Sequence, residues 1–229
     1  MNISDASLFR LLAWMSPAFP TGAFSYSHGI EQAVELGLVS DKASLVGWIT
    51  AAMRQGAGRV DAALLAAAWN AAARGDGAAL ADTIELSAAW RGSAELALES
   101  ESQGAAFLAA TRTAWPAPAI DRLTAETQTG RIMLPVAVGV AAAAHGIPLE
   151  RILLGYLQAF AANLVSAGVR LIPLGQTAGQ QALAAIEASV SDAVADALGT
   201  PLDQIGTAAP MIDICSMRHE IQYTRLFRS

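Results

Sequence analysis

Charged residues are scarce in this 229-residue chain, and lysine and cysteine are nearly absent. Only 15% of the residues are charged, against about 25% in an average soluble domain, whereas 54% are hydrophobic. A chain of this length buries roughly 70% of its unfolded surface without needing disulfides or metals. Because so few charges cannot cover the remaining surface, we expect self-association or complex formation to cover part of it.

The single cysteine, Cys215, excludes an internal disulfide, and residues 1–5 lack the basic and apolar regions of a secretory signal. We therefore expect the protein in the cytoplasm. Its net charge of −6 argues against nucleic-acid binding, which requires a clustered basic surface. The apolar run at 132–144 contains Pro135 and is shorter than the roughly 18–20 residues of a membrane span. This run predicts a buried helix, and no membrane partner is expected.

Motifs of common enzymes and metal sites are also missing. The three histidines, His28, His145 and His219, show no metal-ligand spacing, so we interpret them as core or capping groups. The glycines at 56–58 are not followed by the lysine of a phosphate-binding loop, and Lys42 is the only lysine. A site assembled from distant residues stays open. The sequence otherwise predicts no catalytic site, no metal and no cofactor.

Alanine and leucine dominate, and no segment alternates polar and apolar residues as a half-buried strand does. The expected fold class is therefore all-α, a single-domain bundle of about ten helices without a sheet. Ser4 and Ser40 mark helix starts, and a proline-rich break at 16–22 and Gly37 mark helix ends. The predicted helices cover residues 5–15, 28–36, a stretch after Ser40, 59–73, 77–89, 92–111, 130–145, 148–167 and 176–198. The longer connections are 112–129 and 199–213.

Three segments are too polar, aromatic or glycine-rich for simple core helices. The first, 20–31, holds Phe24, Tyr26 and His28 between two glycines. A plain loop entering a helix, with Ser27 as its N-cap, is the alternative interpretation. The segment therefore stays a candidate interaction site.

The second such segment, 163–176, carries Arg170 alone among apolar residues and ends at Gln176. An isolated charge in an apolar stretch is either paired in the interior or presented at an interface. The sequence alone leaves both alternatives open.

The third segment, 216–229, is basic and aromatic although the protein as a whole is acidic. A frayed terminus is the alternative. Arginine, tyrosine and phenylalanine are anchor types at interfaces, and an exposed Leu226–Phe227 pair would be a solubility liability. We therefore predict two units, an all-helical domain at 1–215 and a partner-docking tail at 216–229.

At these segments the sequence resembles the UreF family of urease accessory proteins, and the similarity runs through the whole chain. The motifs that carry it are PTGAFSYSHGIE at 20–31, ESESQG at 99–104, NLVSAGVRLIPLGQ at 163–176 and SMRHEIQYTRLFRS at 216–229. The last motif is highly specific. Small departures from the family pattern are Ala23, Cys215, Ile221 and Thr224.

The resemblance implies an all-helical, dimerising, non-catalytic protein that joins the accessory protein UreD, also called UreH, and recruits the GTPase UreG. The complex helps deliver nickel to apo-urease. By the same resemblance the tail packs on UreD/UreH and becomes ordered there, and the segment around Arg170 faces UreG. In an alternative, Arg170 or a tail arginine acts as a finger on the nucleotide of UreG. The partner-binding residues expected on this basis are Phe24, Tyr26, His28, Arg170, Gln176, Arg218, His219, Glu220, Tyr223, Arg225, Leu226 and Phe227.

Overall fold

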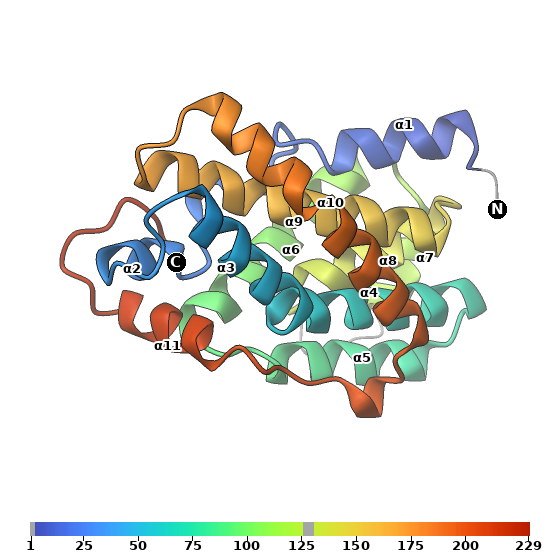
Figure 1. Cartoon of the computed structure of the whole chain (residues 1–229). Helices are drawn as coiled ribbons and strands as arrows, with labels where there is room; N and C mark the ends of the chain where they lie inside the picture. The colour runs from blue at the N-terminus through green and yellow to red at the C-terminus, as the bar shows by residue number, and fades with distance from the viewer. Residues whose placement is uncertain (1–2, 126–130) are drawn as a thin grey trace.

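Helices account for nearly all regular structure in the computed structural model, which describes residues 3–125 and 131–229 (Figure 1). Over these residues the chain forms eleven α-helices and two short 3-10 helices and no strand, which confirms the all-α prediction. The elements are α1 (Asp5–Trp14), η1 (Ala23–Ser25), α2 (Ile30–Glu35), α3 (Lys42–Arg54), α4 (Ala57–Arg74), α5 (Gly77–Ala89), α6 (Ala94–Ala114), α7 (Pro118–Ala125), α8 (Leu134–Ala144), α9 (Leu149–Leu171), α10 (Gln176–Gly199), η2 (Leu202–Gln204) and α11 (Pro210–His219).

Helix starts agree with the sequence prediction at one cap and differ at two others. Ser4 caps α1 by accepting a hydrogen bond from the Ser7 amide, as predicted. The cap of α3 is Asp41 rather than Ser40, because the Asp41 carboxylate and Ser44 form a reciprocal capping box. The cap of α2 is Gly29 rather than Ser27.

Two helices, α7 and α11, lie where the sequence predicted connections or an irregular tail. Each begins at a proline, Pro118 or Pro210. Proline suits the first position of a helix because its missing N–H has no partner there anyway. The sequence interpretation treated these prolines only as breaks. The end of the predicted connection 112–129 and the first residue of the predicted helix 130–145 fall on residues 126–130, outside the described part of the chain.

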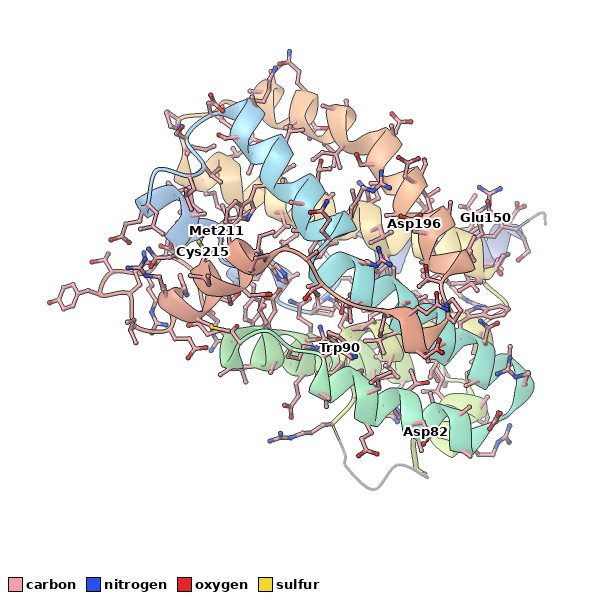
Figure 2. All side chains as sticks on the ribbon, turned by 60° about the horizontal axis from the view of Figure 1, so that its bottom comes forward. Asp82, Trp90, Glu150, Asp196, Met211 and Cys215 are labelled. Carbon is pink, nitrogen blue, oxygen red and sulfur yellow. The ribbon has the colours of Figure 1, made fainter. Side chains whose placement is uncertain are left out.

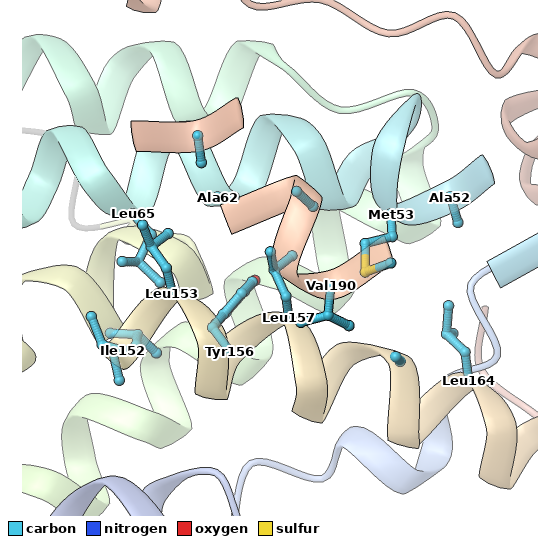
Figure 3. Packing of buried hydrophobic residues seen from close by; sticks show 14 of the residues in the cluster. Ala52, Met53, Ala62, Leu65, Ile152, Leu153, Tyr156, Leu157, Leu164 and Val190 are labelled. Atoms are coloured by element: carbon cyan, nitrogen blue, oxygen red, sulfur yellow. The ribbon is translucent and has the colours of Figure 1, made fainter. Parts of the chain in front are cut away.

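The core forms around α8 and α9. Every residue from Pro135 to Ala142 of α8 is buried, and this helix packs on α4 and α6. The chain before α8 passes so close to α6 that a Cβ at Gly104 would collide with the main chain at Ile132, which explains the glycine of the ESESQG motif. Figure 3 shows Leu153 and Leu157 of α9 meeting Leu65 of α4 and Val190 of α10.

Among the residues that the structure describes, α9 is the one helix long and apolar enough to cross a membrane by length and composition, with a mean hydropathy of 1.6. Half of its most apolar window is nevertheless buried inside the protein, where α9 packs on α2, α3, α4, α8 and α10. We therefore interpret α9 as a core helix. The sequence prediction had singled out the shorter run at 132–144, most of which forms α8.

The helices α1 and α11 lie at opposite ends of the molecule (Figure 1). Figure 2 shows the same separation, with Met211 and Cys215 of α11 on one side and Glu150, at the start of α9, on the other. After α11 the chain loops back, and its last residues lie beside α2. Helix α11 itself spans the boundary that the sequence suggested between residues 215 and 216.

Candidate functional site

Three carboxylates receive the C-terminal segment of the chain, and we call them the acidic cradle: Glu31 of α2 and Glu95 and Glu99 of α6. Glu95 and Glu99 are four residues apart, so they share one face of α6. Their side chains are largely buried, with exposed fractions of 9%, 11% and 13% for Glu31, Glu95 and Glu99. Buried carboxylates are stable only when their oxygens are paired, and the tail supplies the partners.

Glu31 binds the tail at three atoms. One carboxylate oxygen accepts the Leu226 N–H at 2.6 Å, and the other accepts the Phe227 N–H at 2.9 Å. The second oxygen also lies 3.1 Å from Nε2 of His219. A single side chain of α2 therefore contacts both the end of α11 and the tail seven residues further on.

His219 is completely buried between two members of the cradle. Its Nδ1 lies 2.7 Å from Glu95, and its Nε2 faces Glu31. Each ring nitrogen thus faces a carboxylate oxygen at hydrogen-bond distance. Arg225 pairs with Glu95 as well, with Nη1 at 2.8 Å. His219, Arg225, Glu31 and Glu95 thus form one compact network.

The last three residues are held by the loop before α2 and by α9. The Phe227 side chain is buried, and the Arg170 guanidinium of α9 lies over its ring at 4.3 Å from the centroid. Partial burial lowers the pKa of Arg170 from its usual value. The Arg228 N–H donates to the Ser25 carbonyl at 2.8 Å, and the main-chain oxygen of Ser229 accepts the N–H and the hydroxyl of Ser27.

Close contacts also fix α11 against α2 and α6. Gly29 has a φ of +79°, and a Cβ there would come within 3.1 Å of the Ser216 main-chain nitrogen. The Ser216 hydroxyl lies 2.6 Å from that of Ser93, the N-cap of α6. The Glu220 carboxylate accepts the Ala94 N–H at 3.1 Å and so stabilises the positive end of the α6 dipole.

His28 is buried in a left-handed conformation with a φ of 55°. Its ring stands edge-on to Phe160 at 5.3 Å, and its Nδ1 lies 3.7 Å from Glu99. Neither ring nitrogen forms a hydrogen bond within the described residues. His28 therefore packs as a core residue. The Glu99 carboxylate accepts a hydrogen bond from the Ser229 hydroxyl at 2.8 Å instead.

The remaining predicted partner-binding residues divide into buried and exposed ones. Tyr26 is buried, with its carbonyl accepting from Asn163. Phe24, Gln176 and Arg218 are exposed, and Gln176 is the first residue of α10. The structure thus brings His219, Glu220, Arg225, Leu226 and Phe227 together with Arg170, and it buries His219 and Phe227 inside the chain itself.

Several large apolar side chains of α11 and the tail are exposed, and we call this set the outer face. Tyr223 is fully exposed, and Ile221 is 86% exposed. The outer face consists of Met211, Ile214 and Met217 of α11 together with Ile221, Tyr223 and Leu226 of the tail. The sequence interpretation included Tyr223 and Leu226 among the partner-binding residues but not the α11 residues, because it divided α11 between the connection 199–213 and the tail 216–229.

A second surface, at the other end of the molecule, was not predicted. An open groove of about 620 Å³ runs between α1 and α9. Phe9 and Leu12 of α1 are 67% and 65% exposed, and Leu12 lines the groove. The remaining lining residues are Ile3, Leu8, Leu11, Met15, Arg151, Leu154, Gly155 and Gln158. We call this surface the α1–α9 face.

The interior holds one further polar group that sequence reasoning missed. Arg91 donates to Asp61 at 2.8 Å, and the Tyr156 hydroxyl donates to the other Asp61 oxygen at 2.8 Å. Burial first, and the Asp61 charge second, raise the pKa of Tyr156 well above its usual value. Asp61 could have been recognised in the sequence, because it is a charged residue directly before a run of alanine and leucine. The same kind of pattern, a charge among apolar residues, singled out Arg170. These three residues tie α4 and α9 to the segment between α5 and α6.

Within the described residues, no group of three or more histidine, cysteine, aspartate or glutamate side chains has an arrangement that could hold a metal ion. The cradle carboxylates are occupied by hydrogen bonds from the tail.

Comparison with known proteins gives a consistent result. The sequence model of the UreF family matches residues 39–187. A protein of Granulibacter bethesdensis named urease accessory protein UreF is 53% identical over 228 residues, which cover 100% of this chain and 96% of the relative. A protein of the same name from Rhodopseudomonas palustris is 52% identical, with 98% of this chain and 93% of the relative covered. Another from a Methylobacterium species is 47% identical over 96% of this chain and 87% of the relative.

Proposed function

The chain belongs to the UreF family of urease accessory proteins, and on that premise we propose that it is a non-catalytic scaffold for nickel insertion into apo-urease in the cytoplasm. In this role it bridges UreD/UreH and the GTPase UreG. The family membership supports a part in urease maturation, and the outer face supports the mode of action. Six large apolar side chains on α11 and the tail are exposed, and exposed apolar side chains in such number favour contact with another protein.

The partner for the outer face is UreD/UreH. Arg218 is exposed on the last turn of α11, and Arg228 is exposed near the end of the tail. On a protein with a net charge of −6, these two cations beside an apolar surface favour a hydrophobic hollow rimmed by carboxylates. The observation that carries the proposal is the full exposure of Tyr223, an interface-anchor residue, in a tail whose other aromatic residue, Phe227, is buried.

The test is co-purification of the full-length chain with UreD/UreH. Tyr223→Ala and Ile221→Ala remove only exposed atoms, so both variants are expected to fold. Each should weaken binding by about 10-fold or more, the loss typical of a hot-spot residue. Leu12→Ala, which removes an exposed apolar side chain at the opposite end, is the matched control and should bind as the unmodified chain does. Undiminished binding of both tail variants would refute the outer face as the docking surface.

Self-association is the second part of the proposal. The α1–α9 face carries both protruding side chains, Phe9 and Leu12, and a hollow between α1 and α9. A two-fold interface requires a surface of this self-complementary kind, because each copy supplies the same patch. The two helices that form it carry charges of both signs, Asp5 and Arg10 on α1 and Glu150 and Arg151 at the start of α9. We propose a homodimer formed through this face.

The surface for UreG is proposed to include Arg170 and Gln176, together with Phe24 beside the tail. The alternative function, direct acceleration of GTP hydrolysis by a supplied arginine, requires a guanidinium free to reach the nucleotide. The Arg170 guanidinium instead lies on the Phe227 ring, and its Nε donates to the Ser166 carbonyl. Single-turnover GTP hydrolysis by UreG with and without this chain separates the two, since a supplied arginine accelerates hydrolysis by about 10³–10⁵-fold.

A further inference from the structure

Residues 90–94, which join α5 to α6 and which we call the α5–α6 junction, contact α11 closely. A Cβ at Gly92 would come within 2.5 Å of the Asp213 carboxylate of α11. The Ser93 hydroxyl lies 2.6 Å from that of Ser216, about one turn further along α11. The position of α11, and of the apolar side chains that it exposes, therefore depends on where this junction lies.

Arg91, in the middle of the junction, is anchored in the interior with a side chain that is only 6% exposed. Its Nε donates to the Ser87 carbonyl of α5 at 3.0 Å, and its Nη1 donates to Asp61 of α4 at 2.8 Å. The other Asp61 oxygen accepts the Tyr156 hydroxyl of α9. Groups from three helices thus fix the Arg91 guanidinium, and Arg91 in turn holds the junction that bears Gly92 and Ser93.

Position explains this buried ion pair better than stability does. Nη2 of Arg91 has no hydrogen-bond partner within the described residues, and a buried ion pair is often no more stabilising than apolar residues of similar volume. What the pair provides is a defined geometry, because a planar guanidinium reaches two separate acceptors in one orientation only.

We propose that Arg91, held by Asp61, is a positioning residue that fixes the α5–α6 junction for α11 and thereby places the outer face toward UreD/UreH. The inference rests on the proposed function in its choice of partner. It requires that α11 lies on the junction in the complex, and the junction itself belongs to the helical body of the chain. A receiving surface that is fixed in advance loses less entropy on association.

The first variant replaces the polar group by apolar side chains of similar volume, Asp61→Leu, Arg91→Met and Tyr156→Phe together. This apolar variant leaves no buried charge unpaired, so it should unfold at about the same urea concentration as the unmodified chain. The matched control is Arg112→Met, which removes an exposed arginine that pairs with Asp121 at the other end of α6.

Hydrogen exchange of the isolated full-length proteins tests the junction without any partner. The Leu96 amide donates to the Ser93 hydroxyl at 3.1 Å, so its protection reports on the position of the junction. It should exchange about 10-fold faster in the apolar variant, the effect of losing one ordinary hydrogen bond. Exchange in α8 should be the same in all proteins, and Arg112→Met should leave Leu96 unchanged. Equal exchange of Leu96 in the apolar variant and the unmodified chain would overturn the proposal.

Arg91→Lys decides the matter if the apolar variant does not fold. Lysine keeps the charge but lacks the planar fork, so it cannot hold the Ser87 carbonyl and Asp61 in one fixed orientation. Leu96 exchange should rise in this variant by a smaller factor. An unchanged exchange rate would contradict the positioning role.

The second test measures the affinity of the same proteins for UreD/UreH. The apolar variant should bind about 10-fold more weakly, and Arg112→Met should bind as the unmodified chain does. A disulfide between Ser93→Cys and Ser216→Cys, on a Cys215→Ser background, holds α11 on the junction directly and should restore the affinity of the apolar variant. A cross-link that forms without restoring binding would refute the proposal, and so would its failure to form in the otherwise unmodified chain.

The two tests also separate this inference from the proposed function. If the unmodified chain does not bind UreD/UreH while the apolar variant loosens Leu96, the proposed partner fails and the positioning role stands. If binding is intact and the apolar variant changes neither exchange nor affinity, the positioning role alone fails.

Discussion

At the scale of single residues, the carboxylates of the acidic cradle bind the locally basic tail and hold it against the rest of the chain. Its central residue is His219, which the sequence suggested both as a core histidine and as a partner-binding one. The structure places it wholly inside, between Glu31 and Glu95. Its contribution to partner binding is therefore indirect, through the conformation of the tail.

Replacing His219 by alanine should destabilise the protein strongly. The change leaves buried oxygens of Glu31 and Glu95 without their His219 partner, and each unsatisfied buried polar group costs about 1–3 kcal/mol, more when it is charged. Urea unfolding followed by circular dichroism measures the loss. Arg218→Ala, at the neighbouring exposed position, should change the free energy of unfolding by less than about 0.5 kcal/mol. A loss below about 1 kcal/mol for His219→Ala would mean that the network contributes little to stability.

Cys215 should be unreactive in the folded protein. Burial raises the pKa of its thiol, and the nearby Arg218 charge offsets only part of this effect. Because a raised pKa leaves less thiolate at any given pH, the reactive form appears only at higher pH. Labelling with a thiol reagent at pH 8 should be at least about 100-fold slower in buffer than in urea. Comparable rates in the two conditions would show that α11 opens readily.

At the scale of elements, the short helix α2 acts as a support for α11. Its N-cap is Gly29, whose left-handed conformation lets the α2 start approach the Ser216 main chain. The same helix supplies Glu31. A six-residue helix that would be unstable in isolation is thus held by tertiary contacts on both sides.

Gly29→Ala and Gly37→Ala separate backbone strain from close packing. Both glycines have positive φ, +79° and +71°, but a Cβ at Gly37 would meet no atom within 4 Å. Gly37→Ala should therefore cost about 1 kcal/mol from backbone strain alone. Gly29→Ala should cost about 1–3 kcal/mol more, because it also forces α2 away from α11. Chemical denaturation of both variants gives this difference, and equal losses would show that the α2–α11 contact adapts easily.

At the scale of the whole molecule, two surfaces at opposite ends have different proposed occupants, UreD/UreH at the outer face and a second copy at the α1–α9 face (Figure 1). Their separation allows both to be occupied at once. The low charge content of the chain, 15%, is consistent with a protein that covers much of its surface in a complex.

Leu12→Asp should convert a dimer into a monomer. A carboxylate at this 65% exposed position would be buried without a partner in a two-fold contact. Size-exclusion chromatography with light scattering measures the mass, with Tyr223→Asp as the control that should remain dimeric. A monomeric unmodified chain at micromolar concentration, or a dimeric Leu12→Asp variant, would rule out the α1–α9 face.

Much of this protein follows from the sequence by itself. The helical periodicity and the lack of alternating polar and apolar residues determined the all-α class. Apolar residues at a period of 3.6 gather on one face of a helix, whereas on a strand they would be scattered over both faces. The Ser4 cap and most of the long helices follow from the same local rules. The composition and motifs of residues 216–229 marked the tail, since arginine beside aromatic residues is unusual at the end of an acidic chain.

Only the tertiary structure decided which contacts the tail residues form and which of them are exposed. Glu31 and Phe227 are 196 positions apart, and no local pattern predicts that a carboxylate of α2 accepts the Phe227 amide. The same holds for Arg170 over Phe227 and for Tyr156 on Asp61. Exposure is likewise a property of the folded chain, so the sequence could name Phe227 and Tyr223 together but not place the first inside and the second outside. Such pairings arise when packed helices bring distant residues into contact, and they depend on the whole arrangement rather than on any one segment.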